Sequence, residues 1–166
     1  MTLKSKKGQM ILAALSVLSA VVMVIALMAT GGQREVPFEP PPFEKDAQTG
    51  VPQLAQELGY SELDCKAYRI GVCGDVRYAD GALDVYLTNP EENNVWLKLR
   101  VLDESGAILG ETGIIRPGEY VRSVKLDHVP PLGSPVVLKV MGYEIETYYS
   151  AGAVTLTTML TEGGTP

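Results

Sequence analysis

The sequence has few of the side chains that most often carry out chemistry: its 166 residues include one histidine, one tryptophan and two cysteines. A single histidine, His128, cannot complete a zinc site, which needs three or four ligands. It also precedes two prolines, and no Gly-x-Ser-x-Gly elbow for a serine nucleophile is present. No Gly-Lys-Ser/Thr motif is present to bind a nucleotide phosphate. These shortages predict that the protein is not an enzyme and uses no cofactor or metal.

Positive charge is also scarce. The chain has 14 Lys and Arg against 20 Asp and Glu, a net charge of −6. Three of the lysines and no acidic residue precede position 30, so the rest of the chain carries eleven basic and twenty acidic residues, about −9. Such a surface repels a phosphate backbone. We therefore expect no nucleic-acid partner.

The sequence does contain one long apolar run, residues 10–29, which has no charged residue. Twenty helical residues span the ~30 Å hydrocarbon layer of a membrane. Three lysines lie within residues 1–9, and positively charged flanks stay in the cytoplasm, so the chain from Thr30 onward is predicted to be extracytoplasmic. This indicates a single-pass protein of the cell membrane. The alternative is a cleaved secretory signal, because Ala29-Thr30-Gly31 has the small residues of a cleavage site.

A second alternative comes from the residues that precede the apolar run. Lys6-Lys7-Gly8, followed by Gln9 and an apolar stretch, resembles the cleavage context of class III signal peptides in type IV pilin-like proteins. The resemblance implies cleavage after Gly8 and a filament or secretion-apparatus subunit. Those families usually carry Glu at the fifth position after cleavage, where this chain has Ala13.

Residues 30–60 are predicted to be a proline-rich spacer, with prolines at positions 37, 40, 41, 42 and 52. Proline disfavours both helix and central strand, so an extended or irregular chain is expected. Phe38 and Phe43, the only two phenylalanines, lie here; they are expected either to dock a peptide or to pack back on the domain or the membrane interface. A short helical turn that ends at Gly59 is predicted at the end of the spacer.

Residues 61–162 form the predicted domain, followed by a flexible tail at 163–166. Apolar residues there alternate with a period of two, which is typical of half-buried strands. Seven or eight strands are expected, at 63–69, 72–78, 83–88, 95–102, 107–115, 120–126, 136–143 and 153–161. No helix of ten residues separates them, so the fold class is all-β: an antiparallel two-sheet sandwich of immunoglobulin-like or fibronectin-like architecture, with a small barrel as the alternative. Segment 120–126 alternates poorly and is expected to contain a bulge or form an edge.

The two cysteines, Cys65 and Cys73, lie on the predicted extracytoplasmic side, where oxidation is permitted. If strands 63–69 and 72–78 form a hairpin that turns near Ile70-Gly71, the two residues face each other and a disulfide is possible. Two reduced cysteines are the alternative.

The remaining candidate site is a surface. Tyr86 and Trp96 have the parity opposite to the core residues on consecutive predicted strands, beside Lys98 and Arg100. Exposed aromatic rings stack against sugars or anchor protein partners. The alternative is that Trp96 covers cross-strand neighbours or packs under the spacer.

These patterns together predict a membrane-anchored, extracytoplasmic β-sandwich that acts as a non-catalytic interaction or assembly module of the cell envelope. Its expected partners are the membrane, through residues 10–29, and a protein or a second copy of this chain. The pilin-like subunit and a carbohydrate-binding surface module are the alternatives.

Overall fold

The computed structural model describes residues 10, 15–25, 38–53 and 58–163. They belong to two compact units, Met1–Glu39 and Pro40–Pro166. In the first unit, residues 15–25 form an α-helix. Within the described residues, no helix has both the length and the apolar character needed to cross a membrane.

Several predictions about the N-terminal part lie partly or wholly outside the described residues. They concern the basic segment 1–9, both ends of the apolar run 10–29, the cleavage sites after Gly8 and near Ala29, and most of the short helical turn before Gly59. The last three residues of the predicted tail also lie outside.

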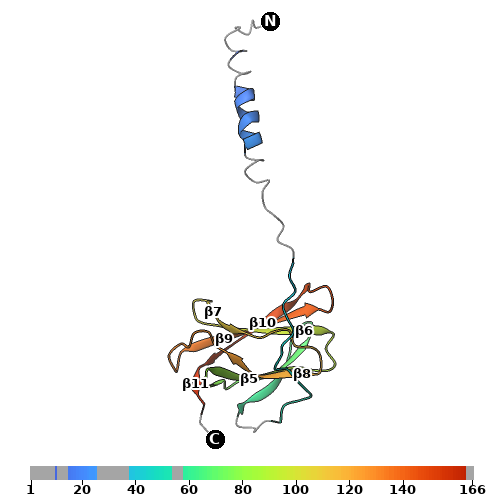
Figure 1. Ribbon diagram of the computed structural model, residues 1–166, viewed down its shortest axis with the longest axis vertical. Coiled ribbons are helices and arrows are strands. Elements are labelled where there is room, and N and C mark those ends of the chain that lie inside the picture. The colour runs from blue at the N-terminus through green and yellow to red at the C-terminus, as the bar shows by residue number, and fades with distance from the viewer. Residues whose placement is uncertain (1–9, 11–14, 26–37, 54–57, 164–166) are drawn as a thin grey trace. The chain divides into compact units, whose positions relative to one another are not determined.

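The second unit contains two β-sheets that pack face to face, one of which has seven strands in the described part of the chain (Figure 1). These strands are β1 (Gln48–Thr49), β2 (Tyr60–Asp64), β3 (Arg69–Cys73), β4 (Arg77–Ala79), β5 (Ala82–Asn89), β8 (Glu119–Lys125) and β11 (Thr161–Glu162). The main path has the order β1-β8-β5-β3-β2. β4 pairs with the first residues of β5, and β11 pairs with β4 in the only parallel ladder between the described strands.

The other sheet has four described strands, all antiparallel, in the order β10-β9-β6-β7. They are β6 (Val95–Leu102), β7 (Ile108–Glu111), β9 (Pro135–Glu144) and β10 (Ser150–Met159). β9 is one of the two inner strands, paired with β6 over eight residues and with β10 over nine. The free edges of this sheet are therefore β7 and β10.

The core lies between the two sheets and follows the alternation in the sequence. Every second residue of the long strands points inward, because side chains alternate between the faces of a strand. These inward residues are almost completely buried; they include Leu83, Val85, Leu87, Leu97, Leu99, Val101, Val136, Leu138 and Val140. Burial of each such side chain contributes about 1.5–3 kcal/mol. The predicted all-β, two-sheet sandwich is confirmed, and its separate ladders differ from the single closed sheet of a barrel.

The predicted hairpin of strands 63–69 and 72–78 is wrong in register. β2 and β3 form the hairpin, with Tyr60 opposite Cys73, so the chain turns at residues 65–68. This turn contains no Gly, Pro, Asn, Asp or Ser, and the sequence therefore carries no turn signal there.

Gly71, which the sequence places at the turn, is a strand residue. The Tyr60 ring lies across it so closely that a β-carbon on Gly71 would clash with the phenol group. The Tyr60 hydroxyl then donates a hydrogen bond to Thr88 Oγ1 at 2.9 Å. Glycine is required here for a close approach within the sheet, as isolated strand glycines often are.

The new register also overturns the predicted disulfide. Cys65 follows the last residue of β2, whereas Cys73 lies opposite its first residue, Tyr60. The two cysteines are thus roughly 17 Å apart along the ladder, and a disulfide needs Cα atoms within about 7 Å. Both are free thiols; Cys73 is buried and Cys65 half-buried.

Residues 40–49, which we call the strap, belong to the sandwich unit although the sequence predicts them as spacer. Phe43 forms a parallel bridge with Ile114: Glu44 N donates to Ile114 O and Ile114 N donates to Pro42 O, both at 2.8 Å. The strap then pairs with β8 through β1. The predicted strand 107–115 is interrupted at this contact, because β7 ends at Glu111.

Candidate functional site

The four residues of the predicted surface lie on two different sheets. Tyr86 is on β5 in the seven-stranded sheet, whereas Trp96, Lys98 and Arg100 are on β6 in the four-stranded sheet. The chain crosses between the sheets in the loop after Asn89, so strands that are consecutive in sequence are not neighbours in space. Tyr86 and Trp96 therefore do not form one surface.

A buried and a half-buried asparagine hold this crossing loop in place. The fully buried Asn89 donates from Nδ2 to the carbonyl oxygens of Val95 at 2.9 Å and Ile115 at 3.0 Å. Its Oδ1 accepts from Asn93 Nδ2 at 2.7 Å. A fully satisfied polar network of this kind fixes one geometry, because leaving any member unpaired in the interior is costly. The predicted strands 83–88 and 95–102 leave a connecting segment here, but nothing in the sequence pattern indicated these roles of the asparagines.

Trp96 is covered by aromatic side chains from the strap and from the turn between β9 and β10. The Phe43 ring is perpendicular to the indole with centroids 5.2 Å apart, and the Tyr148 ring lies 4.9 Å away at 57°. The Arg116 guanidinium lies 3.6 Å from the centre of the Phe43 ring, within cation–π range. The alternative prediction, that Trp96 packs under the spacer, is confirmed.

Lys98 and Arg100 share one carboxylate. Glu111 accepts from Lys98 Nζ at 2.7 Å and from Arg100 Nε at 2.8 Å. Partial burial raises the pKa of Glu111, but the hydrogen bonds and charges of Lys98 and Arg100 outweigh it and hold the pKa below its ordinary value. Lys98 is only 6% exposed, so this pair belongs to the packing of the outer face rather than to a free basic surface.

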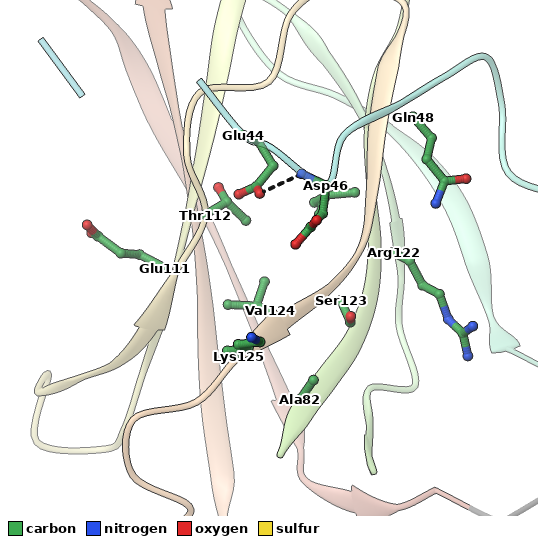
Figure 2. Close-up of a pocket in the computed structure, with 11 residues that line it drawn as sticks. Glu44, Asp46, Gln48, Ala82, Glu111, Thr112, Arg122, Ser123, Val124 and Lys125 are labelled. Atoms are coloured by element: carbon green, nitrogen blue, oxygen red, sulfur yellow. Dashed lines mark hydrogen bonds between the residues drawn. The ribbon is translucent and has the colours of Figure 1, made fainter. Parts of the chain in front are cut away.

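A cleft of about 370 Å³ lies beside the strap, lined by residues of β8, the strap and the end of β7 (Figure 2). Glu44 is fully engaged there, since its carboxylate accepts from Asp46 N at 3.1 Å and from Gly113 N at 2.7 Å. Asp46 turns into the cleft, whereas Arg122 points away from it. Among the described residues, no three His, Cys, Asp or Glu side chains are grouped to hold a metal ion. The Glu44 carboxylate therefore fastens the strap to the segment that follows β7.

The larger depression, about 740 Å³, lies on the seven-stranded sheet and includes Tyr86. Tyr86 and Tyr78 line it together with Arg77, Arg122 and Asp84. Arg122 forms an ion pair with Asp84 at 3.4 Å and lies 5.8 Å from the Tyr86 ring. The charge of Asp84, and then that of Tyr86, raises the pKa of Arg122. We call this depression the Tyr86 groove.

Backbone strain accompanies this groove. Val85 and Tyr86 of β5 together oppose the single Arg122 of β8, which is a β-bulge. Tyr86 has a positive φ of 47° at this bulge. This left-handed conformation is uncommon for a bulky residue and costs roughly 1–3 kcal/mol of folding free energy. The sequence predicts that segment 120–126 contains a bulge or forms an edge; the bulge instead lies in β5, the strand that pairs with β8. The poor alternation around Arg122 was the only sign of it in the sequence.

Comparison with protein-family models, curated proteins and solved structures finds no match for this chain.

Proposed function

We propose that the protein is a non-catalytic, single-pass membrane protein whose extracytoplasmic sandwich, of the immunoglobulin-like or fibronectin-like kind, serves as an interaction module of the cell envelope. The observation that carries this proposal is the strap. Main-chain hydrogen bonds attach it to Ile114 beyond β7 and to β8, so the chain enters the domain through an ordered joint.

The strap also limits the reach of the domain. Only ten residues, 30–39, separate the uncharged run from the strap, and no chain of ten residues reaches farther than about 36 Å. Because Phe43 packs against Trp96, the part of the predicted spacer from Pro40 onward is fixed to the domain and adds nothing to its reach. A domain tethered this closely suits the display of a face or an edge to a partner at the same membrane.

A topology experiment tests this proposal. In a Cys65→Ser/Cys73→Ala background, Glu104→Cys adds a thiol on an exposed turn of the sandwich, and Ser5→Cys adds one in the basic N-terminal segment. In intact cells that express the full chain, we expect a membrane-impermeant maleimide to label the Glu104→Cys variant. The Ser5→Cys variant should react only after lysis. The reverse pattern, or recovery of the chain in the soluble fraction, contradicts the proposal.

A second candidate, a carbohydrate-binding module, is favoured by the Tyr86 groove. Tyrosine rings stack on the apolar faces of sugars, and an Arg–Asp pair supplies directed hydrogen bonds to hydroxyl groups. We expect Tyr86→Ala to reduce retention of the full chain on purified peptidoglycan or on a glycan array at least tenfold, whereas Phe38→Ala has no effect. Equal retention of the wild type and Tyr86→Ala removes this candidate.

A further inference from the structure

The free sheet edges differ in how they are protected. Unpaired strand edges attract other strands, and proteins usually shield them with charges, short strands or covering loops. β2 carries the charged residues Glu62 and Asp64, and β1 and β11 are only two residues long. The edge of β7 is covered by the chain after β8, because Asp127 N donates a hydrogen bond to Leu109 O at 2.7 Å. β10 has ten residues, with neither a charged residue nor a proline. It is the long, unshielded edge among the described strands.

The available part of β10 is short and well defined. At one end, the Tyr68 hydroxyl donates to Gly152 O at 3.2 Å, where a bulge interrupts the ladder with β9. At the other end, Thr158 Oγ1 donates to Gly74 O at 2.8 Å. Between them, the described chain makes no main-chain hydrogen bond to the outer edge of residues 153–157. In an antiparallel ladder, alternate residues of an edge strand direct their N–H and C=O groups outward.

The side chains of this segment also lack complete cover. Val154 and Leu156 point inward and pack against the core, yet both remain partly exposed. Ala153, Thr155 and Thr157 alternate with them on the outer face, opposite residues of β9. A further strand beside β10 would bury both rows.

We propose that this strand is the β10 of a second copy, paired antiparallel about a two-fold axis at Thr155. The proposal rests on the interaction role above and names the partner. Thr155, the midpoint of residues 153–157, then faces its own counterpart, Val154 faces Leu156 and Ala153 faces Thr157. Thr–Thr and aliphatic cross-strand pairs are favourable. The two four-stranded sheets become one continuous sheet.

A second copy fits β10 because this edge, unlike β2, carries no charge. Two copies of a protein with net charge −6 repel each other over most of their surface. Like charges directly opposite in a ladder are destabilising, and self-pairing through β2 would bring acidic residues together at Glu62 and Asp64. β10 brings no charge to its own symmetry axis, and a two-fold interface requires a self-complementary surface.

Cysteine cross-linking of the full chain in detergent tests the axis, in the Cys65→Ser/Cys73→Ala background. Under mild oxidation we expect Thr155→Cys to give a covalent dimer, because residues directly opposite have Cβ atoms about 5 Å apart. Thr157→Cys alone should give none, whereas Thr157→Cys mixed with Ala153→Cys should cross-link. Equal cross-linking of every variant, no cross-linking, or a mixed disulfide with a different protein in cells overturns the proposal.

Charge exchange gives an independent test by sedimentation of the full chain. Thr155 is exposed in a single copy. Thr155→Lys and Thr155→Glu each place like charges on the two-fold axis, so each should raise the dissociation constant of the dimer about tenfold or more. An equimolar mixture of the two variants should form a heterodimer, because its charges are opposite. Thr49→Lys, the same change on β1, should sediment like the wild type. A monomeric wild type, or a dimer insensitive to Thr155→Lys, overturns the pairing. A cytosolic location would instead remove the membrane role and leave these results unchanged.

Discussion

Cys73, at the end of β3, shows how the fold controls the chemistry of a single residue. Burial, and then the charges of Asp84 and Asp75, raises the pKa of its thiol to about 11. The thiolate is the reactive form, so about 100-fold less of it is present at pH 8 than for an ordinary cysteine. We therefore expect Cys73 to react about 100-fold more slowly with an aromatic disulfide reagent in the native protein than in urea. The absorbance of the thiol that the reagent releases measures this rate.

The same assay checks the corrected hairpin register. Denatured protein kept from air should release two equivalents of thiol without a reductant, since both cysteines are free. A Cys73→Ala variant should lose the slow phase and keep the faster phase of Cys65. Fewer than two thiols would show that the native chain contains a disulfide and that the ladder between Tyr60 and Cys73 is incorrect.

Glu111 provides a prediction about pH at the scale of one residue. Its pKa is lowered in the folded state, so its contribution to stability is present above the unfolded value of about 4.3 and is lost as pH falls through the lower folded value. Glu111→Gln leaves the buried ammonium of Lys98 without its counter-charge. We expect a loss of about 1–2 kcal/mol at pH 7, discounted because the Glu111 side chain is 39% exposed.

Urea denaturation at pH 7 and pH 2 measures this effect. The difference between the wild type and Glu111→Gln should shrink as pH falls from 7 to 2, because protonation removes from Glu111 the charge that the variant lacks. Lys98→Met combined with Glu111→Gln should recover most of the loss at pH 7, because apolar replacements of a buried ion pair are often neutral or stabilising. A constant difference between the wild type and Glu111→Gln at both pH values would show that charge is not the cause.

At the scale of elements, the strap can be followed through the only tryptophan of the chain. Phe43 packs edge-on against Trp96 at 5.2 Å. We expect Phe43→Ala to destabilise the domain by about 1–2 kcal/mol, to shift tryptophan emission to longer wavelength and to increase quenching by acrylamide. Phe38→Ala is the matched control, since Phe38 is 66% exposed and lies in the other compact unit. Identical spectra for the two variants would contradict a docked strap.

A methyl group on Gly113 perturbs the same contact from the opposite side. A β-carbon there would lie 2.6 Å from Glu44 N, closer than a β-carbon approaches any atom to which it is not bonded, so Gly113→Ala must displace the strap. We expect its quenching to resemble that of Phe43→Ala although every aromatic ring is retained. Gly50→Ala has nothing within 4 Å of the added carbon and serves as the control, although its φ of 103° also strains the backbone. A wild-type quenching profile for Gly113→Ala would contradict the bridge between Phe43 and Ile114.

Elements differed in how well the sequence predicted them. β5, β6 and β9 alternate strictly, and their predicted bounds are close to the observed ones. The turn between β4 and β5 lies in the gap between the predicted strands 72–78 and 83–88, and its residues Asp80 and Gly81 both adopt positive φ, as hairpin turns require. The turn at residues 65–68 was missed because its residues form turns only through tertiary packing: the Tyr68 ring lies against Gly142 and its hydroxyl donates to Val140 O at 3.3 Å.

At the scale of the whole molecule, periodicity predicted the sandwich but not the distribution of strands between its sheets. A hydrophobic period of two identifies the residues of each strand that face the core. The same period results whether consecutive strands pair with each other or lie in opposite sheets, so it does not predict the pairing. Tyr86 and Trp96 were therefore assigned to one surface although a layer of core separates their strands. The strap was missed for a related reason, since prolines predict an extended chain but not the surface on which it lies.

The mature N-terminus decides between the three accounts of the first thirty residues. We expect intact mass analysis of membrane-extracted protein to give the full chain of 17.9 kDa, beginning at Met1 or, after removal of the initiator, at Thr2. The physical reason is the apolar run of twenty residues, longer than the ~7–15 of a cleaved signal. A chain that starts at Gln9 supports the filament subunit, and Gly8→Val should then block the cut. A start near Thr30 removes the anchor, and with it the tether that the strap is proposed to complete.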